Sequence, residues 1–305
     1  MNALAKGIKL FFLETRPHFL LLSVALSCVG TTMAWYDGHF NVLFFILAML
    51  GLLLIHTSCN VLNDYFDYRC GIDKETVRTP FSGGSGFLAT GALVPRDVYI
   101  LGVACFGIAG GIGLFFLTIR GWALLPILIV GGASTYFYST HVARWTLGEF
   151  SAGINLGVLP VLGTYFVQSG SYSWEALIGS LPSGILTYNL LLINEYPDVE
   201  PDKRAGRKNL VIVLGKRRAS ILYLVTSALV YLCIILGVIF TVLPLGTLLG
   251  LLTMPIALKA VRGALSKYDG KGEDFLPVMG LNVMVVLVTQ ALLALGYLLS
   301  GYWAH

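Results

Sequence analysis

The stretch that decides the fold is NVLFFILAMLGLLLIHTSCNVLNDYFD, residues 41–67. It begins as an almost unbroken apolar run, and it ends in a cluster of amide and carboxylate side chains. The apolar part is long enough to cross a bilayer as a helix. Carboxylates beside hydrocarbon are costly, so acidic side chains gathered there are candidates for function. The stretch therefore predicts a membrane-spanning helix with a functional end.

The rest of the chain has the same apolar character. Its 305 residues are 56% hydrophobic and 12% charged, with a mean hydropathy of +0.80. Soluble domains carry about 25% charged residues, which excludes that class. We expect an all-α integral membrane protein, one domain over residues 1–305, built as a bundle of nine transmembrane helices. The expected spans are 18–36, 41–62, 98–118, 121–139, 148–168, 175–194, 219–240, 242–262 and 277–299.

The basic residues predict the orientation. Of 20 Lys and Arg residues, only Arg120 falls in the set of short loops opposite the N-terminus. The positive-inside rule then predicts a cytoplasmic N-terminus, an outer C-terminus and a multi-pass protein of the cell membrane. Because the basic residues line one side of a membrane, the net charge of +4 does not indicate a nucleic-acid partner. No feature of the sequence indicates an obligate protein partner.

A second acidic cluster follows a later span. It reads Asn194-Glu195-Tyr196-Pro197-Asp198 and continues to Asp202. Like the first cluster, it opens with Asn and places an Asp four residues later, so the chain resembles a diverged repeat. Two such units packed face to face would bring both clusters to one cavity mouth, in cytoplasmic loops at about 63–97 and 195–218.

The first cluster has helical spacing. Asn60, Asn63, Asp64 and Asp67 lie three and four residues apart, so on a helix they share one face. Oxygen-rich sites of this kind suit Mg²⁺, which takes one or two carboxylates and completes its shell with water and phosphate oxygens. A solvated loop start is the plainer interpretation of any one Asp. The Gly/Ser-rich segment 78–86 could cradle phosphate through its N–H groups or be only a flexible connector.

The second cluster places acids directly before bases. Asp198 and Asp202 are followed by a basic run, an order that suits a metal–diphosphate ligand. The run consists of Lys203, Arg204, Arg207 and Lys208, and Lys203 and Arg204 are the candidates for contact with the diphosphate. The alternative is that these bases only set topology. Further candidates for substrate binding are Asn194, Arg16, Tyr138, which is more simply an interfacial aromatic, and Glu149, which is equally an ordinary helix-start acid.

These motifs resemble the UbiA superfamily of intramembrane prenyltransferases. Asn63, Asp64 and Asp67 match the first family motif, and Asp198 and Asp202 match the second. The resemblance covers nearly the whole chain and implies nine helices, Mg²⁺ bound by these five residues, a polyprenyl diphosphate donor and an aromatic acceptor. It also implies that the four aspartates are catalytic.

The first motif departs from the family pattern at its end. The last Asp would fall at Gly71, and Asp73 comes two residues later. This shift, with the sequences Gly148-Glu149, 163–170 and 202–206, resembles the menaquinone-type branch, whose acceptor is 1,4-dihydroxy-2-naphthoate. The segment 79–86 and the sequence Asn194-Glu195-Tyr196-Pro197 are less typical of that branch.

Other functions stay open at this point. Within prenyl transfer, the acceptor could instead be a hydroxybenzoate, homogentisate, haem or a glycerol phosphate lipid. A transporter also uses intramembrane acids and repeats, but its acids lie near the bilayer midplane rather than at span ends. Phosphatidyl transfer on CDP-alcohols would need one dense acidic motif instead of two separate clusters.

Overall fold

The computed structural model describes residues 3–71, 78–137, 146–270 and 272–304. Within these ranges all regular secondary structure is helical. The helices are α1 (Ala3–Glu14), α2 (Pro17–Tyr36), α3 (Val42–Cys70), α4 (Pro95–Arg120), η2 (Trp122–Leu124), α5 (Leu125–Phe137), α6 (Gly148–Gly153), η4 (Ile154–Val158), α7 (Leu159–Ser169), α8 (Trp174–Asn194), α9 (Val199–Arg204), α10 (Leu210–Leu214), α11 (Lys216–Ile239), η5 (Leu245–Thr253), α12 (Met254–Lys267) and α13 (Gly272–Ala304).

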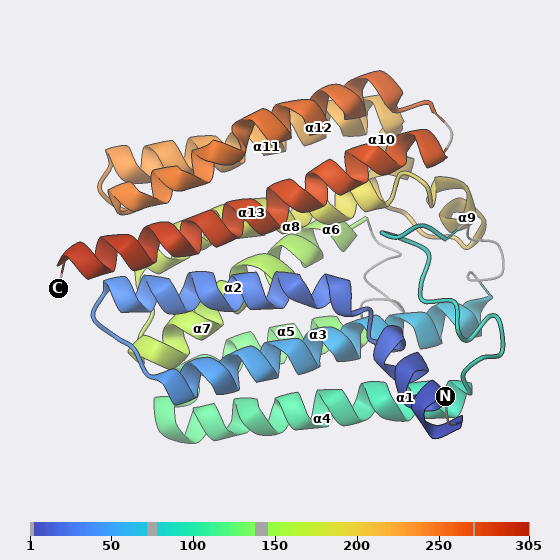
Figure 1. The fold of residues 1–305 in the computed structure, drawn as a ribbon, viewed down its shortest axis with the longest axis horizontal. Helices are drawn as coiled ribbons and strands as arrows, with labels where there is room; N and C mark the ends of the chain where they lie inside the picture. Colours follow the sequence, from blue (N-terminus) through green and yellow to red (C-terminus); the bar gives the residue numbers. More distant parts are fainter. Residues whose placement is uncertain (1–2, 72–77, 138–145, 271, 305) are drawn as a thin grey trace.

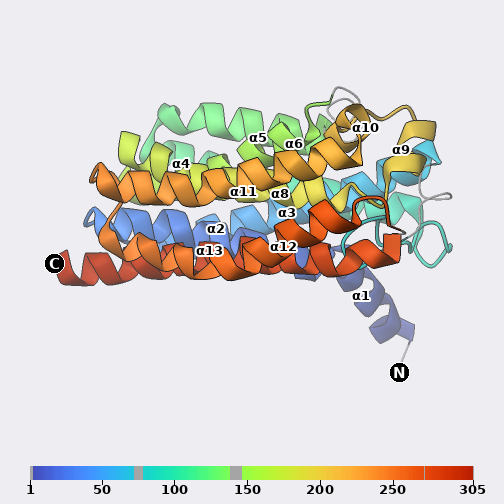
Figure 2. The same ribbon diagram turned by 90° about the horizontal axis from the view of Figure 1, so that it is seen from above.

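The membrane fold is confirmed. In the described part of the chain, eight helical segments are long and apolar enough to cross a bilayer, and Trp122–Phe137 is a shorter apolar helix at the position of the fourth expected span, 121–139. The long helices lie side by side, with the C-terminus at one end of the bundle and α9, α10 and segment 78–94 at the other (Figure 1). Helix α1 leaves the bundle at an angle at that second end (Figure 2).

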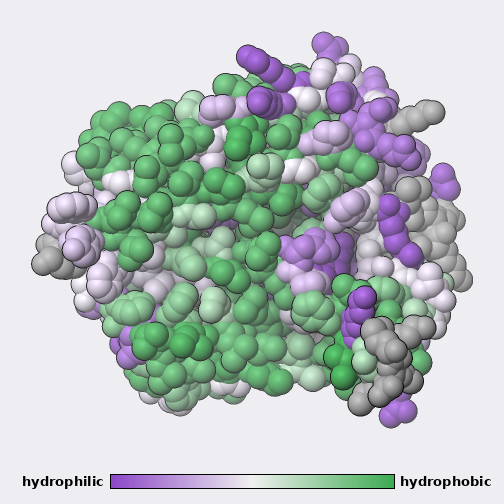
Figure 3. Space-filling view, viewed as in Figure 1, coloured by the Kyte–Doolittle hydropathy of each residue, from purple (hydrophilic) through white to green (hydrophobic). Residues whose placement is uncertain are grey.

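The surface agrees with a bilayer environment. On the face shown in Figure 3, apolar residues cover most of the bundle, and hydrophilic residues gather mainly at the end that carries α9 and α10. Exposed large apolar side chains are spread over many helices, among them Ile46 on α3, Ile108 on α4 and Leu232 on α11. A soluble protein rarely exposes so much continuous apolar surface.

Helix α3 extends beyond its expected end at residue 62. It starts where the Asn41 side chain accepts hydrogen bonds from the N–H groups of Leu43 and Phe44. It stops at Gly71, whose φ of 79° is the left-handed conformation that ends many helices. Asn63, Asp64 and Asp67 therefore lie on the last two turns of this helix, not in the predicted loop.

The predicted span 148–168 is helical but not uniform. Its middle, η4, is a π-helical turn just before Pro160. Proline has no N–H to donate to the carbonyl four residues earlier, and Thr187 Oγ1 on α8 donates to that Leu156 oxygen at 3.4 Å. Gly157 lets the two helices touch, since a Cβ there would lie 2.7 Å from Gly184 Cα. Close packing through small residues is typical of membrane helices.

Candidate active site

A cavity of about 620 Å³ lies within the bundle. Its walls come from α2, α3, α4, α5, the α6–η4–α7 segment and α8, and residues 207–209 close one end. Most of the lining is apolar, including Leu26, Leu52, Phe116 and Leu159. The polar end carries residues of both acidic clusters, namely Asn63, Asp67, Asn194, Asp198 and Asp202. The structure thus brings the two clusters to one cavity.

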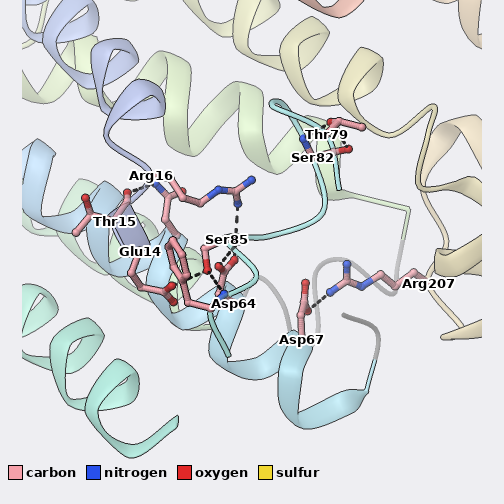
Figure 4. Close-up of polar contacts among 11 residues, drawn as sticks. Glu14, Thr15, Arg16, Asp64, Asp67, Thr79, Ser82, Ser85 and Arg207 are labelled. Carbon is pink, nitrogen blue, oxygen red and sulfur yellow. Dashed lines mark hydrogen bonds and ion pairs between the residues drawn. The ribbon is translucent and has the colours of Figure 1, made fainter. Parts of the chain in front are cut away.

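Asp64 on α3 is held by residues that precede α2 and α4. The Ser85 N–H donates to Asp64 Oδ2 at 2.6 Å, and Ser85 Oγ donates to Glu14 Oε2 at 2.5 Å. Arg16 Nη1 lies 3.8 Å from Asp64 Oδ1. Figure 4 shows these four side chains grouped around the end of α3. Asp64 is only 2% exposed, so these neighbours replace the water that would otherwise surround its carboxylate.

Asp67 lies one turn further along α3 and pairs with a different basic side chain. Its carboxylate pairs with Arg207, and Figure 4 shows the two side chains pointing at each other. Arg207 also lies 3.5 Å from Asp202 Oδ1, while Asn209 Nδ2 donates to Asp202 Oδ2 at 3.1 Å. One guanidinium therefore connects the first acidic cluster to the second.

The glycine-rich segment after α3 reaches both clusters. Its turn is closed by Thr79 Oγ1, which accepts from the Ser82 N–H at 2.8 Å. Ser82 Oγ donates to Asp198 Oδ1 at 3.5 Å, and Ser85 contacts Asp64 as described above. Gly83 and Gly84 both have positive φ, and both line the cavity. The segment therefore forms part of the wall at the polar end of the cavity.

Two carboxyl groups of the second cluster have raised pKa values and are therefore weaker acids than usual. Burial, and then the nearby Asp202 carboxylate, raise the pKa of Asp198 to about 7. Burial also raises the pKa of Asp202, although Arg207 opposes this effect. Carboxylates in this state are stabilised by any added cation, which neutralises their mutual repulsion.

The donor set fits a divalent ion that shares its shell with a ligand. Carboxylate and amide oxygens line the polar end of the cavity, and Asn194 Oδ1 there is buried without a hydrogen-bond partner. Across the described residues, no three His, Cys, Asp or Glu side chains come together closely enough to hold an ion alone. Mg²⁺ bound through one or two carboxylates plus phosphate oxygens needs no such group of three.

The Glu149 side chain contacts two other segments, the start of α10 and the end of α8. It is fully buried, and its Oε1 accepts from the Leu210 N–H at 2.6 Å, which fixes the start of α10. Its carboxyl group also meets that of Glu195, at the end of α8. Burial, and next the Glu149 carboxyl group, raise the pKa of Glu195 well above its usual range.

The remaining predicted residues divide into three groups. Asn60, Asn63 and Arg16 line the cavity, and Asn60 Nδ2 also donates to the Thr15 carbonyl at 3.1 Å. Asp73 and Tyr138 lie outside the described residues.

Lys203 and Arg204 are exposed on α9 and are not part of the cavity wall. Lys203 pairs with the exposed Glu200 at 3.2 Å. Arg207 and Lys208 line the cavity instead, so the basic groups near the acids come a few residues later than the pair singled out in the sequence.

Sequence reasoning did not single out Glu14, Ser85 or Asn155. It named Glu195 and Arg207 only as members of the second cluster and of the basic run after it, without a role of their own. The signal for Arg207 was present, because it follows the second cluster in the same basic run. Glu14 gave no such signal, since it ends an amphipathic helix far from either motif.

The chain resembles characterised proteins over nearly its whole length. Residues 23–285 match the family model described as the UbiA prenyltransferase family. A 1,4-dihydroxy-2-naphthoate octaprenyltransferase from Bacillus subtilis is 28% identical, with 94% of this chain and 92% of that protein covered. A 2-carboxy-1,4-naphthoquinone phytyltransferase from Synechocystis is 27% identical, with 96% and 94% covered.

Solved structures share the fold. A UbiA homologue from Aeropyrum pernix K1 has a TM-score of 0.71 at 19% identity, with 92% of this chain and 98% of that one covered. A UbiA homologue from Archaeoglobus fulgidus, bound to GPP and Mg²⁺, has a TM-score of 0.63 at 14% identity, with 93% and 99% covered.

Proposed function

Because the chain belongs to the UbiA prenyltransferase family, we propose that it transfers a polyprenyl group from a polyprenyl diphosphate to an aromatic acceptor in an Mg²⁺-dependent reaction. We propose 1,4-dihydroxy-2-naphthoate as the acceptor, the substrate named for several relatives. One observation carries the proposal. Both acidic clusters lie at the polar end of a single cavity whose other walls are apolar.

We assign the roles of the polar residues from their positions in and beside the cavity. Asn63, Asp64, Asp67, Asp198 and Asp202 are the proposed Mg²⁺ ligands, and Asn60 and Asn194 extend the same polar surface. Mg²⁺ bound there would neutralise the diphosphate and so make it a better leaving group.

Basic groups and apolar walls complete the proposed site. Arg207 and Lys208 line the cavity beside the acids and can hold phosphate oxygens. The apolar walls hold the prenyl tail and exclude water from an allylic cation. Arg16 neutralises Asp64 and orients the first cluster. For Lys203 and Arg204, and for Asp73 and Tyr138, contact with the substrates stays a prediction.

The position of the acids argues against transport. They lie at the end of the bundle that carries α9 and α10 (Figure 1), whereas transporter sites lie near the midplane. We further propose that residues 1–305 form a single prenyltransferase domain of the cell membrane with this end in the cytoplasm. The basic residues support that orientation.

A radiolabelled polyprenyl diphosphate tests the function. The purified protein in nanodiscs is expected to release diphosphate and form one prenylated product with dihydroxynaphthoate and Mg²⁺, but not with EDTA. Hydroxybenzoate, homogentisate, haem and a glycerol phosphate lipid form the acceptor panel. A folded protein that releases no diphosphate with any of them would contradict the proposed function.

Substitutions connect that activity to both clusters. Asp67→Asn and Asp198→Asn should each lower the transfer rate about 100-fold or more, because each removes a charge that holds the cations opposite the leaving group. The control is Asp97→Asn, an exposed acid in the first turn of α4, which should keep its activity. Equal loss in all three variants would point to a general charge effect instead.

A further inference from the structure

Helix α1 carries apolar side chains that the bundle does not cover. Ile8 and Phe12, one turn apart, are 63% and 60% exposed, and Lys9 beside them is exposed as well. We call these three residues the exposed face of α1. The helix leaves the bundle at an angle (Figure 2). Apolar surface is costly to leave in water, so this face needs a partner from outside the chain.

The position of α1 identifies the bilayer surface as that partner. The helix ends at Glu14, and the first candidate membrane span begins at Pro17. Between them, Arg16 has a left-handed backbone with a φ of 55°, so α1 does not continue the axis of α2. It therefore lies at the level where a span enters the bilayer. A helix there with apolar side chains next to a basic one is typical of an interfacial helix.

The opposite face of α1 packs on the segment between α3 and α4. Leu10 and Phe11 contact a small apolar core that includes Leu88 and Leu93 from that segment. Tyr65 on α3 packs against the same core. Helix α1 therefore has one face on the protein, close to the first acidic cluster, and another face that is available to lipid.

The last residue of α1 connects the helix to that cluster. Glu14 is fully buried, and its Oε2 accepts a hydrogen bond from Ser85 Oγ at 2.5 Å. The Ser85 N–H in turn donates to Asp64 Oδ2 at 2.6 Å, and Figure 4 shows the three residues together. A buried carboxylate needs such donors. A displacement of α1 would move Glu14, and with it the donor that holds Asp64.

We propose that the exposed face of α1 docks on the bilayer surface, and that Glu14 is a positioning residue which holds Asp64 through Ser85. The apolar side chains of this face enter the boundary between headgroups and acyl chains, and its lysine meets the lipid phosphates. Contact with lipid then fixes the helix whose last residue orders the first acidic cluster. The inference does not depend on the proposed prenyl transfer, because it concerns where α1 lies and what its last residue holds.

Fluorescence quenching tests where α1 lies. In a Cys70→Ser background, which removes the exposed thiol, Phe12→Cys is labelled with an NBD fluorophore. The full-length protein is placed in nanodiscs of phosphatidylethanolamine and phosphatidylglycerol. We expect quenching by a lipid with a shallow doxyl group and protection from aqueous iodide. The control is a label at Lys203→Cys, on the exposed side of α9, which should show the reverse. Quenching of the label at residue 12 by iodide alone overturns the docking, whether water or an absent protein covers this face.

Hydrogen exchange in the same nanodiscs tests the connection to the acidic cluster. Peptides that cover residues 82–90 report the Ser85 amide, whose exchange is slow while it donates to Asp64. The double variant Ile8→Gln/Phe12→Gln should raise the exchange rate of these peptides about tenfold, because α1 loses its lipid contact and the hydrogen bond opens more often. Both substituted side chains are exposed, so the bundle itself should stay folded.

Two substitutions of Glu14 separate positioning from packing. Glu14→Ala removes the acceptor for Ser85 Oγ and should raise the exchange rate of the same peptides by a similar factor. Glu14→Gln keeps an oxygen that can accept this hydrogen bond and should preserve the slow exchange. Equal acceleration in both variants overturns the positioning role, because it would show that only the packing around residue 14 matters.

A matched double variant controls for the loss of exposed apolar side chains. Leu245→Gln/Trp303→Gln alters residues on η5 and α13 that are 72% and 83% exposed, and it should leave the exchange of residues 82–90 unchanged. Unchanged exchange in Ile8→Gln/Phe12→Gln would overturn the transmission from lipid to the acidic cluster. None of these measurements uses prenyl transfer, so a protein that transfers no prenyl group can still confirm the role of α1.

Discussion

Arg207 is the residue that makes the two acidic clusters one site. It pairs with Asp67 on α3 and with Asp202 on α9, and its side chain is 17% exposed. Removing one partner of a fully buried ion pair costs about 3–5 kcal/mol because a charge is left unpaired. For Arg207 the expected loss of unfolding free energy is smaller, since its side chain keeps some contact with solvent.

Arg207→Ala should therefore make the protein depend on divalent cations for stability. With EDTA its thermal unfolding midpoint is expected below that of the unsubstituted protein, because Asp67 and Asp202 repel each other. Mg²⁺ should raise the midpoint of the variant more than that of the unsubstituted protein, since the ion replaces the missing guanidinium. The matched control is Lys203→Ala, which removes only an exposed ion pair with Glu200. It should change neither the unfolding midpoint with EDTA nor the increase caused by Mg²⁺. No extra stabilisation by Mg²⁺ in Arg207→Ala would contradict this role.

At the scale of single residues, the sequence predicts which side chains lie together only where those residues have helical spacing. Asn60, Asn63 and Asp67 could be assigned to one face because helical periodicity is local. The pairing of Asp67 with Arg207 joins residues 140 positions apart, and that of Glu14 with Ser85 joins residues 71 apart. Such contacts depend on how whole helices pack, so no local pattern indicated them.

At the scale of elements, the contact between η4 and α8 decides the shape of the cavity wall. Sequence patterns predicted both spans correctly, because long apolar runs are a strong signal. They did not predict the π-helical turn before Pro160 or the end of α3 at Gly71. Both features depend on backbone hydrogen bonds that hydropathy does not report.

Gly157→Ala tests that contact. The new Cβ would lie 2.7 Å from Gly184 Cα, and backbone atoms cannot move aside without separating the helices. We expect a loss of stability of about 1–3 kcal/mol, measured as a lower thermal unfolding midpoint, with weaker acceptor binding. The control is Gly107→Ala on α4, where nothing lies within 4 Å of the added methyl group. An unchanged midpoint for Gly157→Ala would show that the helices are not packed as tightly as described.

For the whole molecule, the important property is the difference between its two ends. The N-terminal helix, both acidic clusters and the glycine-rich segment 78–86 gather at one end, and the turns after α2 and α7 lie at the other (Figure 1). The distribution of Lys and Arg predicted this separation. It also predicted the orientation, with the end that carries the acidic clusters in the cytoplasm.

Cysteine accessibility tests the orientation directly. Cys70 is exposed at the end of α3 beside the acidic clusters, whereas the other four cysteines are partly or fully buried. A charged, membrane-impermeant maleimide should leave Cys70 unlabelled in intact spheroplasts and label it after permeabilisation. In a Cys70→Ser background, Ser171→Cys in the exposed turn between α7 and α8 should be labelled in intact spheroplasts. The reverse pattern would place the active site outside the cell, where a cytoplasmic pool of prenyl diphosphate could not reach it.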